Sequence, residues 1–343
     1  MTAASAQSTV TISGLVRAGV QKDISLTLAN PALVKATAAA PGAAAAAVVA
    51  GKGLATTDIN INFAATEDLG GGLKASFFQN LETDPQRGAA LTRADSGLDL
   101  AGGFGTVAYR NTRNSDQIAS IGSSAISLAD GLYHNTGIVT RTDIDTLSYT
   151  SMPIMPGLNV SVTYVEANNG QINIPTTNTS AYVLGAAYTN GPLVVRAAFK
   201  MKPATLTASS GLKGKDNLEL AVVYDLGLAK IGFAHDAASA SGTSTAAAST
   251  AASGGTLTAA QAQTLANLQT KAANGFSVHV PMGAVSFGLG RYTRGDQKVT
   301  DYGVRYDLSK RTNVTASGGK KSGLFVADGY KGNQYRVAIA HSF

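Results

Sequence analysis

The chain has 343 residues, of which 44% are hydrophobic and 14% charged, and its formal net charge is +6 at pH 7. It has no cysteine, which excludes disulfides, thiolate catalysis and cysteine-ligated metal sites, and it has no apolar run long enough for a spanning helix. The 38 glycines against 9 prolines, with no segment typical of a linker between separate cores, favour one large domain of many short strands.

The N-terminal segment contains the first strand pattern. The sequence Ala-Ser-Ala at 4–6 resembles the cleavage site of an export signal, so we expect residues 1–6 to be a signal-peptide remnant or a cloning scar. Residues 7–343 are expected to form a single domain. From Thr9 to Val20, apolar residues alternate with small or polar ones, which indicates a β-strand with one apolar face. The alanine-rich residues 30–52 show no such alternation and are expected to form a long loop.

The same alternation recurs along the rest of the chain, and turns rich in glycine, proline or aspartate separate the segments. It predicts strands at 58–63, 73–82, 93–100, 106–110, 145–151, 158–166, 181–188, 193–201, 217–224, 229–235, 275–280, 284–292, 299–306, 312–319 and 333–343. A helix-like pattern at 259–272 lies inside one of the longer connections. The count is about sixteen strands, joined by about seven short turns and eight long loops.

The last strand ends the chain on an aromatic residue, Phe343, and has one apolar face, as the first strand does. Pairing the first strand with the last would close the sheet into a barrel without edges. The outward positions between 158 and 224 carry no charge, and several tyrosines stand at strand ends, where their phenol groups would meet lipid headgroups. The predicted fold is therefore all-β: a transmembrane antiparallel β-barrel of about sixteen strands with short periplasmic turns and long extracellular loops.

The connection from Asn111 to Asp143 has no convincing strand pattern. Its length, about thirty residues, is unusual for a structureless loop in a compact domain unless the loop has a function. Because it is also polar, we predict that it lies inside the lumen and narrows it.

Three segments carry a resemblance to a known family: Thr-Glu-Asp-Leu-Gly-Gly-Gly-Leu-Lys-Ala at 66–75, Gly-Phe-Gly-Thr-Val at 103–107 and Tyr-Asp-Leu-Ser-Lys-Arg-Thr at 306–312. With these segments and its terminal phenylalanine, the chain resembles the general diffusion porins of Gram-negative bacteria, of the type common in beta-proteobacteria. The resemblance implies a homotrimer of sixteen-stranded barrels in the outer membrane. It also implies that the third loop folds into the lumen, opposite a row of arginines on the wall, and the long connection described above would be that loop.

The inward charges expected from strand parity are mixed, with a basic excess. The arginines of the first, fourth and fifth strands lie near the predicted infolded loop, and acidic residues on that loop could face them. One further arginine points outward by strict alternation and could join the site only from a bulge or loop position. Any one of these residues could instead be a solvated side chain of a wet interior. The candidate constriction residues are Arg17, Arg93, Arg110 and Arg141 on the wall and Asp116 and Asp130 on the loop.

These observations favour a water-filled channel for passive diffusion of ions and small hydrophilic solutes, with a modest anion preference. Its other expected partners are outer-membrane lipid and lipopolysaccharide. The alternatives are a substrate-specific channel of the same architecture and, from another class, a barrel that acts as a hydrolase or adhesin. The histidines lack the HExxH spacing and no serine lies in a nucleophile-elbow sequence, so no catalytic, metal or cofactor site is expected. The basic residues are spread over alternate strand positions, which argues against a nucleic-acid partner.

Overall fold

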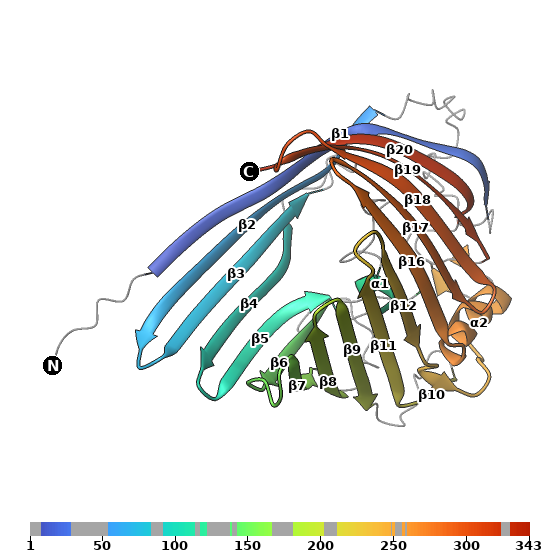
Figure 1. Cartoon of the computed structure of the whole chain (residues 1–343). Coiled ribbons are helices and arrows are strands. Elements are labelled where there is room, and N and C mark those ends of the chain that lie inside the picture. Colours follow the sequence, from blue (N-terminus) through green and yellow to red (C-terminus); the bar gives the residue numbers. More distant parts are fainter. Residues whose placement is uncertain are drawn as a thin grey trace, which may run out of the picture.

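The chain forms a closed antiparallel barrel in the computed structural model, and 16 described strands follow one another around it in sequence order (Figure 1). The structure describes residues 8–28, 54–83, 92–113, 117–121, 138, 143–166, 181–201, 211–247, 249–250, 256–257, 259–323 and 330–343. The predicted fold class is confirmed. The predicted loop at 30–52 and the segment 1–6 lie outside the described residues.

The barrel strands are β1 (Ser8–Leu28), β2 (Leu54–Gly70), β3 (Leu73–Thr83), β4 (Thr92–Gly102), β5 (Gly105–Arg113), β6 (Asp143–Thr150), β7 (Leu158–Val165), β8 (Ala181–Asn190), β9 (Leu193–Met201), β11 (Asn217–Asp225), β12 (Lys230–Asp236), β16 (Ala273–Met282), β17 (Val285–Arg294), β18 (Gln297–Asp307), β19 (Thr312–Ser322) and β20 (Tyr330–Ser342). Two small sheets pair β10 (Lys213–Gly214) with β13 (Ala240–Ser241) and β14 (Ser249–Thr250) with β15 (Thr256–Leu257). The helices are α1 (Gln117–Ile121), α2 (Ala259–Asn267) and the 3-10 turn η4 (Leu268–Thr270). Together, α2 and η4 account for most of the helix expected at 259–272.

The barrel closes where β1 pairs with β20, as the sequence predicts. Gly14 and Phe343 exchange two backbone hydrogen bonds of 3.1 Å each. A Cβ atom at Gly14 would lie 2.3 Å from the Phe343 ring and 2.6 Å from the Asn60 carbonyl oxygen, so the seam has room for glycine only. Closure pairs the edges that an open sheet would leave exposed.

Short turns gather at one end of the barrel, and glycine makes them possible. In the β2–β3 turn, Gly70, Gly71 and Gly72 have φ values of 79°, 61° and 82°, which favour glycine because it has no Cβ atom. At the opposite end, one described connection differs from the expected pattern. The polar residues 293–298 were predicted to belong to a loop, but Arg294 pairs with Gln297 in a two-residue hairpin between β17 and β18.

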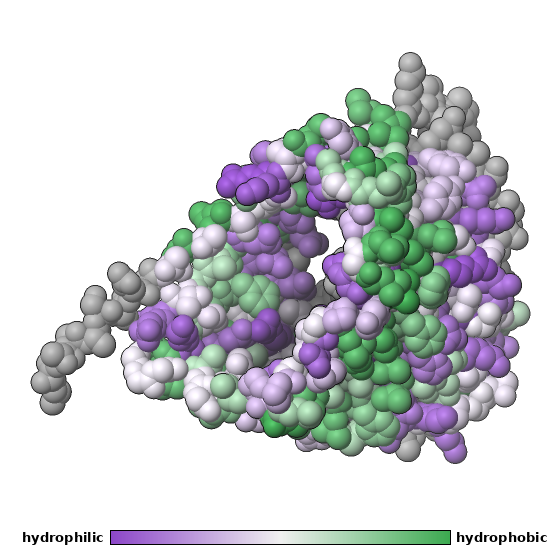
Figure 2. All heavy atoms as spheres, viewed as in Figure 1, coloured by the Kyte–Doolittle hydropathy of each residue, from purple (hydrophilic) through white to green (hydrophobic). Residues whose placement is uncertain are grey.

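The outer surface of the barrel is apolar and the lumen polar. Large outward side chains such as Leu98, Leu184 and Val337 are 56%, 45% and 55% exposed, as expected of residues that face lipid. Figure 2 shows apolar residues in a continuous patch on the outer surface and hydrophilic residues around the opening of the lumen. Among the described residues, no helix is both long and apolar enough to span a membrane.

Candidate functional site

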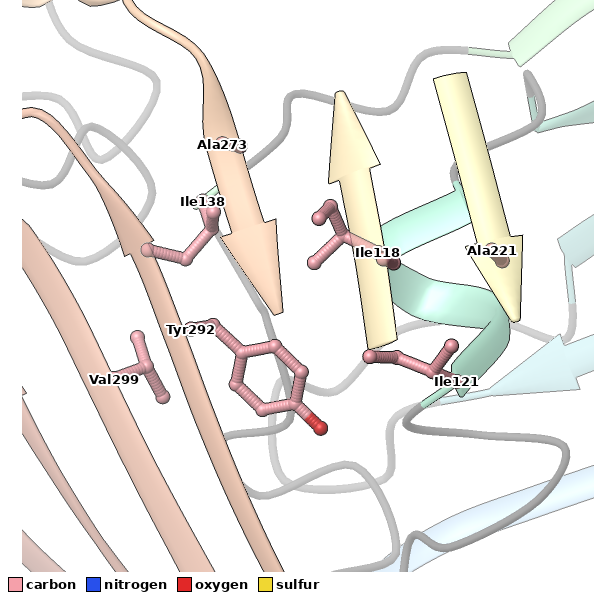
Figure 3. Packing of buried hydrophobic residues seen from close by; sticks show 8 residues of the cluster. Ile118, Ile121, Ile138, Ala221, Ala273, Tyr292 and Val299 are labelled. Atoms are coloured by element: carbon pink, nitrogen blue, oxygen red, sulfur yellow. The ribbon is translucent and has the colours of Figure 1, made fainter. Parts of the chain in front are cut away.

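The described part of the long connection between β5 and β6 lies inside the barrel. Helix α1 packs against the inner faces of β11, β12 and β16 (Figures 1 and 3). Ile118 and Ile121 are fully buried there, and Ile138, from the same connection, is 1% exposed. The prediction that this connection folds into the lumen is therefore confirmed for residues 117–121 and 138.

The strands that α1 contacts, β11, β12 and β16, each present an alanine to the cluster, which lets the helix approach closely. The three isoleucines form one apolar cluster with wall residues, drawn as sticks in Figure 3: Ala221, Ala234, Ala273, Tyr292 and Val299. Each isoleucine side chain removed from water in this way contributes about 1.5–3 kcal/mol, so the cluster can hold the loop on the wall.

Polar contacts anchor the loop at two further points. The hydroxyl of Ser277 donates to the Ile121 carbonyl oxygen at 3.4 Å, and Nη1 of Arg294 donates to the Ile138 carbonyl oxygen at 3.2 Å. Arg294 also donates through Nε to the Leu268 carbonyl oxygen at 2.9 Å, which links the anchor to η4. These contacts hold residues 117–121 and 138 against the wall inside the lumen.

Helix α1 lies on the side of the barrel away from β1 to β5, and two of the predicted arginines lie on that other side. Arg110, on β5, forms an ion pair with Asp99, with 2.5 Å between Nη2 and Oδ2. Its guanidinium also lies over the Phe78 ring, 5.0 Å from the ring centre. Arg17, on β1, is opposite Asp58 of β2 and Ala340 of β20 in the strand register.

Glycine shapes the wall at Arg110. A Cβ atom at Gly97 would lie 2.4 Å from the Phe78 ring and 2.7 Å from Cδ of Arg110. The missing side chain is what lets the arginine and the ring meet across β4.

The other predicted residues are not brought into this arrangement by the described structure. Arg93 belongs to β4 and is opposite Leu81, past a register shift between Gln79 and Leu81, and its side chain lies outside the described part. Arg141, Asp116 and Asp130 lie outside the described residues.

A pocket between α1 and the wall contains basic residues that were not among the candidate constriction residues. It has a volume of about 520 Å³ and is lined by Ser120 of α1, Arg196 of β9 and Lys230 of β12, among others. Nζ of Lys230 lies 3.3 Å from Oδ2 of Asp225. Within the described part of the chain, Arg196 has no ion pair with a carboxylate. Inward strand parity was the available signal for Arg196 and Lys230, but it did not show that they lie beside the infolded loop.

Several other inward cations are paired, which makes the wall mixed in charge. Lys200 pairs with the buried Glu219, and Nε of Arg305 lies 2.7 Å from Oδ1 of Asp307. The inward aromatic residue Tyr292 is 1% exposed because the isoleucines of the loop cover it, so it offers no surface to a passing solute. No cluster of three metal-ligating side chains occurs among the described residues.

Comparisons with known proteins agree with this geometry. The profile of a family described as Gram-negative porin matches residues 2–323. Similar solved structures include a triple mutant of the Rhodopseudomonas blastica porin, 14% identical with a TM-score of 0.58, and an anion-selective porin from Comamonas acidovorans, 21% identical with a TM-score of 0.59. Each alignment covers 98% of this chain and 100% of the other, and at these identities the likeness is one of fold. A comparison with curated proteins gives no match.

Proposed function

Because the chain belongs to the Gram-negative porin family, it is an outer-membrane channel, and we propose that small hydrophilic solutes and ions pass through it by passive diffusion with a modest preference for anions. The family and the closed barrel indicate a channel and not an enzyme. The observation that carries the proposal is the loop segment anchored inside a polar lumen, with Arg17 and Arg110 on strands away from α1.

The anion preference rests on the basic side chains of this lumen. Arg17, Arg110 and Arg196 belong to inward positions, and fixed charge in a wet pore acts over about one Debye length, roughly 8–10 Å at physiological salt. Ions that pass within that distance of the wall sense its charge. Positive wall charge would therefore concentrate anions and repel cations.

The proposed constriction extends to residues that the structure does not describe in full. We assign Arg93 and Arg141 to its basic side and Asp116 and Asp130 to the loop that faces it. We also propose that the barrel assembles as a homotrimer and that its apolar outer band contacts lipid and lipopolysaccharide. Crosslinking in mild detergent would test the assembly, because a resistant monodisperse monomer would contradict it.

Solute uptake into liposomes tests passive diffusion against substrate-specific transport. We expect swelling rates for neutral sugars to fall smoothly with solute size and to rise linearly with concentration, because no described inward aromatic track binds a solute. Saturation at millimolar concentration by one sugar, with others passing slowly, would contradict general diffusion and favour the substrate-specific channel.

A further inference from the structure

A cluster of cations lies on the outside of the barrel, separate from the lumen. Arg291 of β17, Lys298 of β18 and Lys320 of β19 are all exposed. Arg291 and Lys320 are both opposite Thr300 in the strand register, one on each side of it. With strands about 4.8 Å apart, the Cα atoms of the two cations are about 10 Å from each other. Arg291 donates to the hydroxyl of Thr300, which fixes the guanidinium on the outer face.

These cations stand directly above the apolar band. Two residues further from the β17–β18 turn, the outward side chains are Leu289 and Tyr302, which are 48% and 44% exposed. The turn itself is at the end of the barrel opposite the short turns, which is the extracellular end. The cluster therefore lies where the outer leaflet of the membrane changes from acyl chains to headgroups.

No outward position in the described residues of β17, β18 and β19 carries a carboxylate; Asp296, in the β17–β18 turn, is the nearest in sequence. A different sector of the same rim carries a described carboxylate. There Asp145 of β6 accepts hydrogen bonds from the Tyr109 hydroxyl at 3.0 Å and from Asn111 Nδ2 at 2.6 Å. The charged side chains at the described outward positions of β17, β18 and β19 are therefore all positive.

We propose that Arg291, Lys298 and Lys320 bind the phosphate groups of the phosphorylated glycolipid of the outer leaflet, with its acyl chains lying on the apolar band below. Such a ligand matches both parts of the surface, because phosphate pairs strongly with Arg and Lys, and acyl chains cover exposed Leu and Tyr. Free phosphate matches only the cations. The inference rests on the outer-membrane placement of the proposed function and is independent of its ion selectivity.

Native mass spectrometry of the detergent-purified barrel, titrated with bisphosphorylated lipid A, tests the site. The triple variant R291Q/K298Q/K320Q should bind lipid A roughly tenfold or more weakly than the wild type, because each cation near an anionic headgroup adds to the attraction. The control K310Q/R311Q removes two exposed cations from the β18–β19 turn at the other end of the barrel, and its binding should stay within about twofold of the wild type.

Two further arms distinguish the source of the affinity. Dephosphorylated lipid A should bind the wild type much more weakly, and inorganic phosphate at matched concentration should not displace lipid A. Equal binding of the triple variant and the wild type, or equal binding of the two lipids, would overturn the proposal. If the triple variant does not fold, K298Q and K320Q singly should each weaken binding roughly threefold, and unchanged binding by both would overturn it. Single-channel conductance should be unchanged in all variants, so a wild type without conductance would count against the proposed function and not against this site.

Discussion

The side chain of Arg110 is held by the carboxylate of Asp99 and the ring of Phe78, and it fits there because Gly97 has no side chain. The ion pair orients the guanidinium, but it also cancels part of the positive charge that a passing ion senses. Arg196 is different because it has no carboxylate partner within the described part of the chain. Sequence parity predicted inward arginines, but it could not show which of them are paired, because pairing depends on register across neighbouring strands.

Removing the positive charge of Arg110 or of Arg196 should shift ion selectivity toward cations. Arg110→Gln leaves Asp99 uncompensated, and Arg196→Gln removes a cation beside α1, so we expect each to lower the chloride-to-potassium permeability ratio about threefold at 0.1 M salt. The exposed residue Lys213 lies on β10, outside the barrel wall, and Lys213→Gln is the matched control. Ratios for both arginine variants equal to that of the control would remove these residues from the selectivity site.

A charge reversal at Arg93 is a stronger test than a neutral substitution, because it changes the local charge by two units. If its side chain enters the constriction, Arg93→Glu should move the zero-current potential in a potassium chloride gradient toward cation preference, by more than either neutral substitution. Lys213→Glu, which reverses an exposed charge on β10, is the matched control. An equal shift in both variants would show that Arg93 acts only through net charge.

At the scale of elements, the period-two pattern predicted the barrel strands well, because each strand has lipid on one side and water on the other. The hairpin at Gly295 and Asp296 was missed because its residues are polar on both faces beyond the membrane. Helix α1 was missed because it has five residues, and neither an acidic first turn nor a basic last turn marks it. Its apolar signal consists of Ile118 and Ile121, three residues apart on one face, which is too short a pattern to recognise in a loop.

Shortening the infolded loop should widen the channel. Deletion of residues 120–128 removes part of α1 and the segment that follows it, and we expect a higher single-channel conductance in planar bilayers. Unchanged conductance would mean that this loop does not limit the current.

Weakening the apolar cluster that holds the loop on the wall, at full loop length, should change the noise of the channel current. Ile118→Asn together with Ile121→Asn places amides in the apolar cluster, which costs about 1–3 kcal/mol per buried polar group, so the loop should leave the wall part of the time. We expect new fluctuations between conductance levels. The control, Leu265→Asn on α2, changes a partly buried residue of a separate cluster, and equal fluctuations there would point to general destabilisation.

At the scale of the whole molecule, stability depends on closure, because β1 and β20 would each be an open edge without the other. The contact between Gly14 and the Phe343 ring lies at this seam. The sequence predicted that the first and last strands pair, but the need for glycine at this point became visible only from the position of the ring.

A side chain at the seam should weaken the barrel. Gly14→Val would push Phe343 or the β2 backbone aside, and overpacking of this kind costs roughly 1–3 kcal/mol. The temperature at which the folded barrel unfolds on semi-native electrophoresis should fall. Gly103→Val is the control, because a Cβ atom there has nothing within 4 Å and no positive φ is recorded. An equal fall in unfolding temperature in the two variants would mean that close packing at the seam does not account for the lost stability.

The most direct test of the account is the zero-current potential of the wild-type channel in a tenfold potassium chloride gradient. With the loop anchored on one wall and arginines on the other, the potential should have the sign of chloride preference at low salt. It should shrink as salt rises toward 1 M, where the screening length falls to about 3 Å. A potential with the sign of potassium preference at low salt would contradict the account, because the acidic side chains of the lumen and loop would then outweigh the arginines.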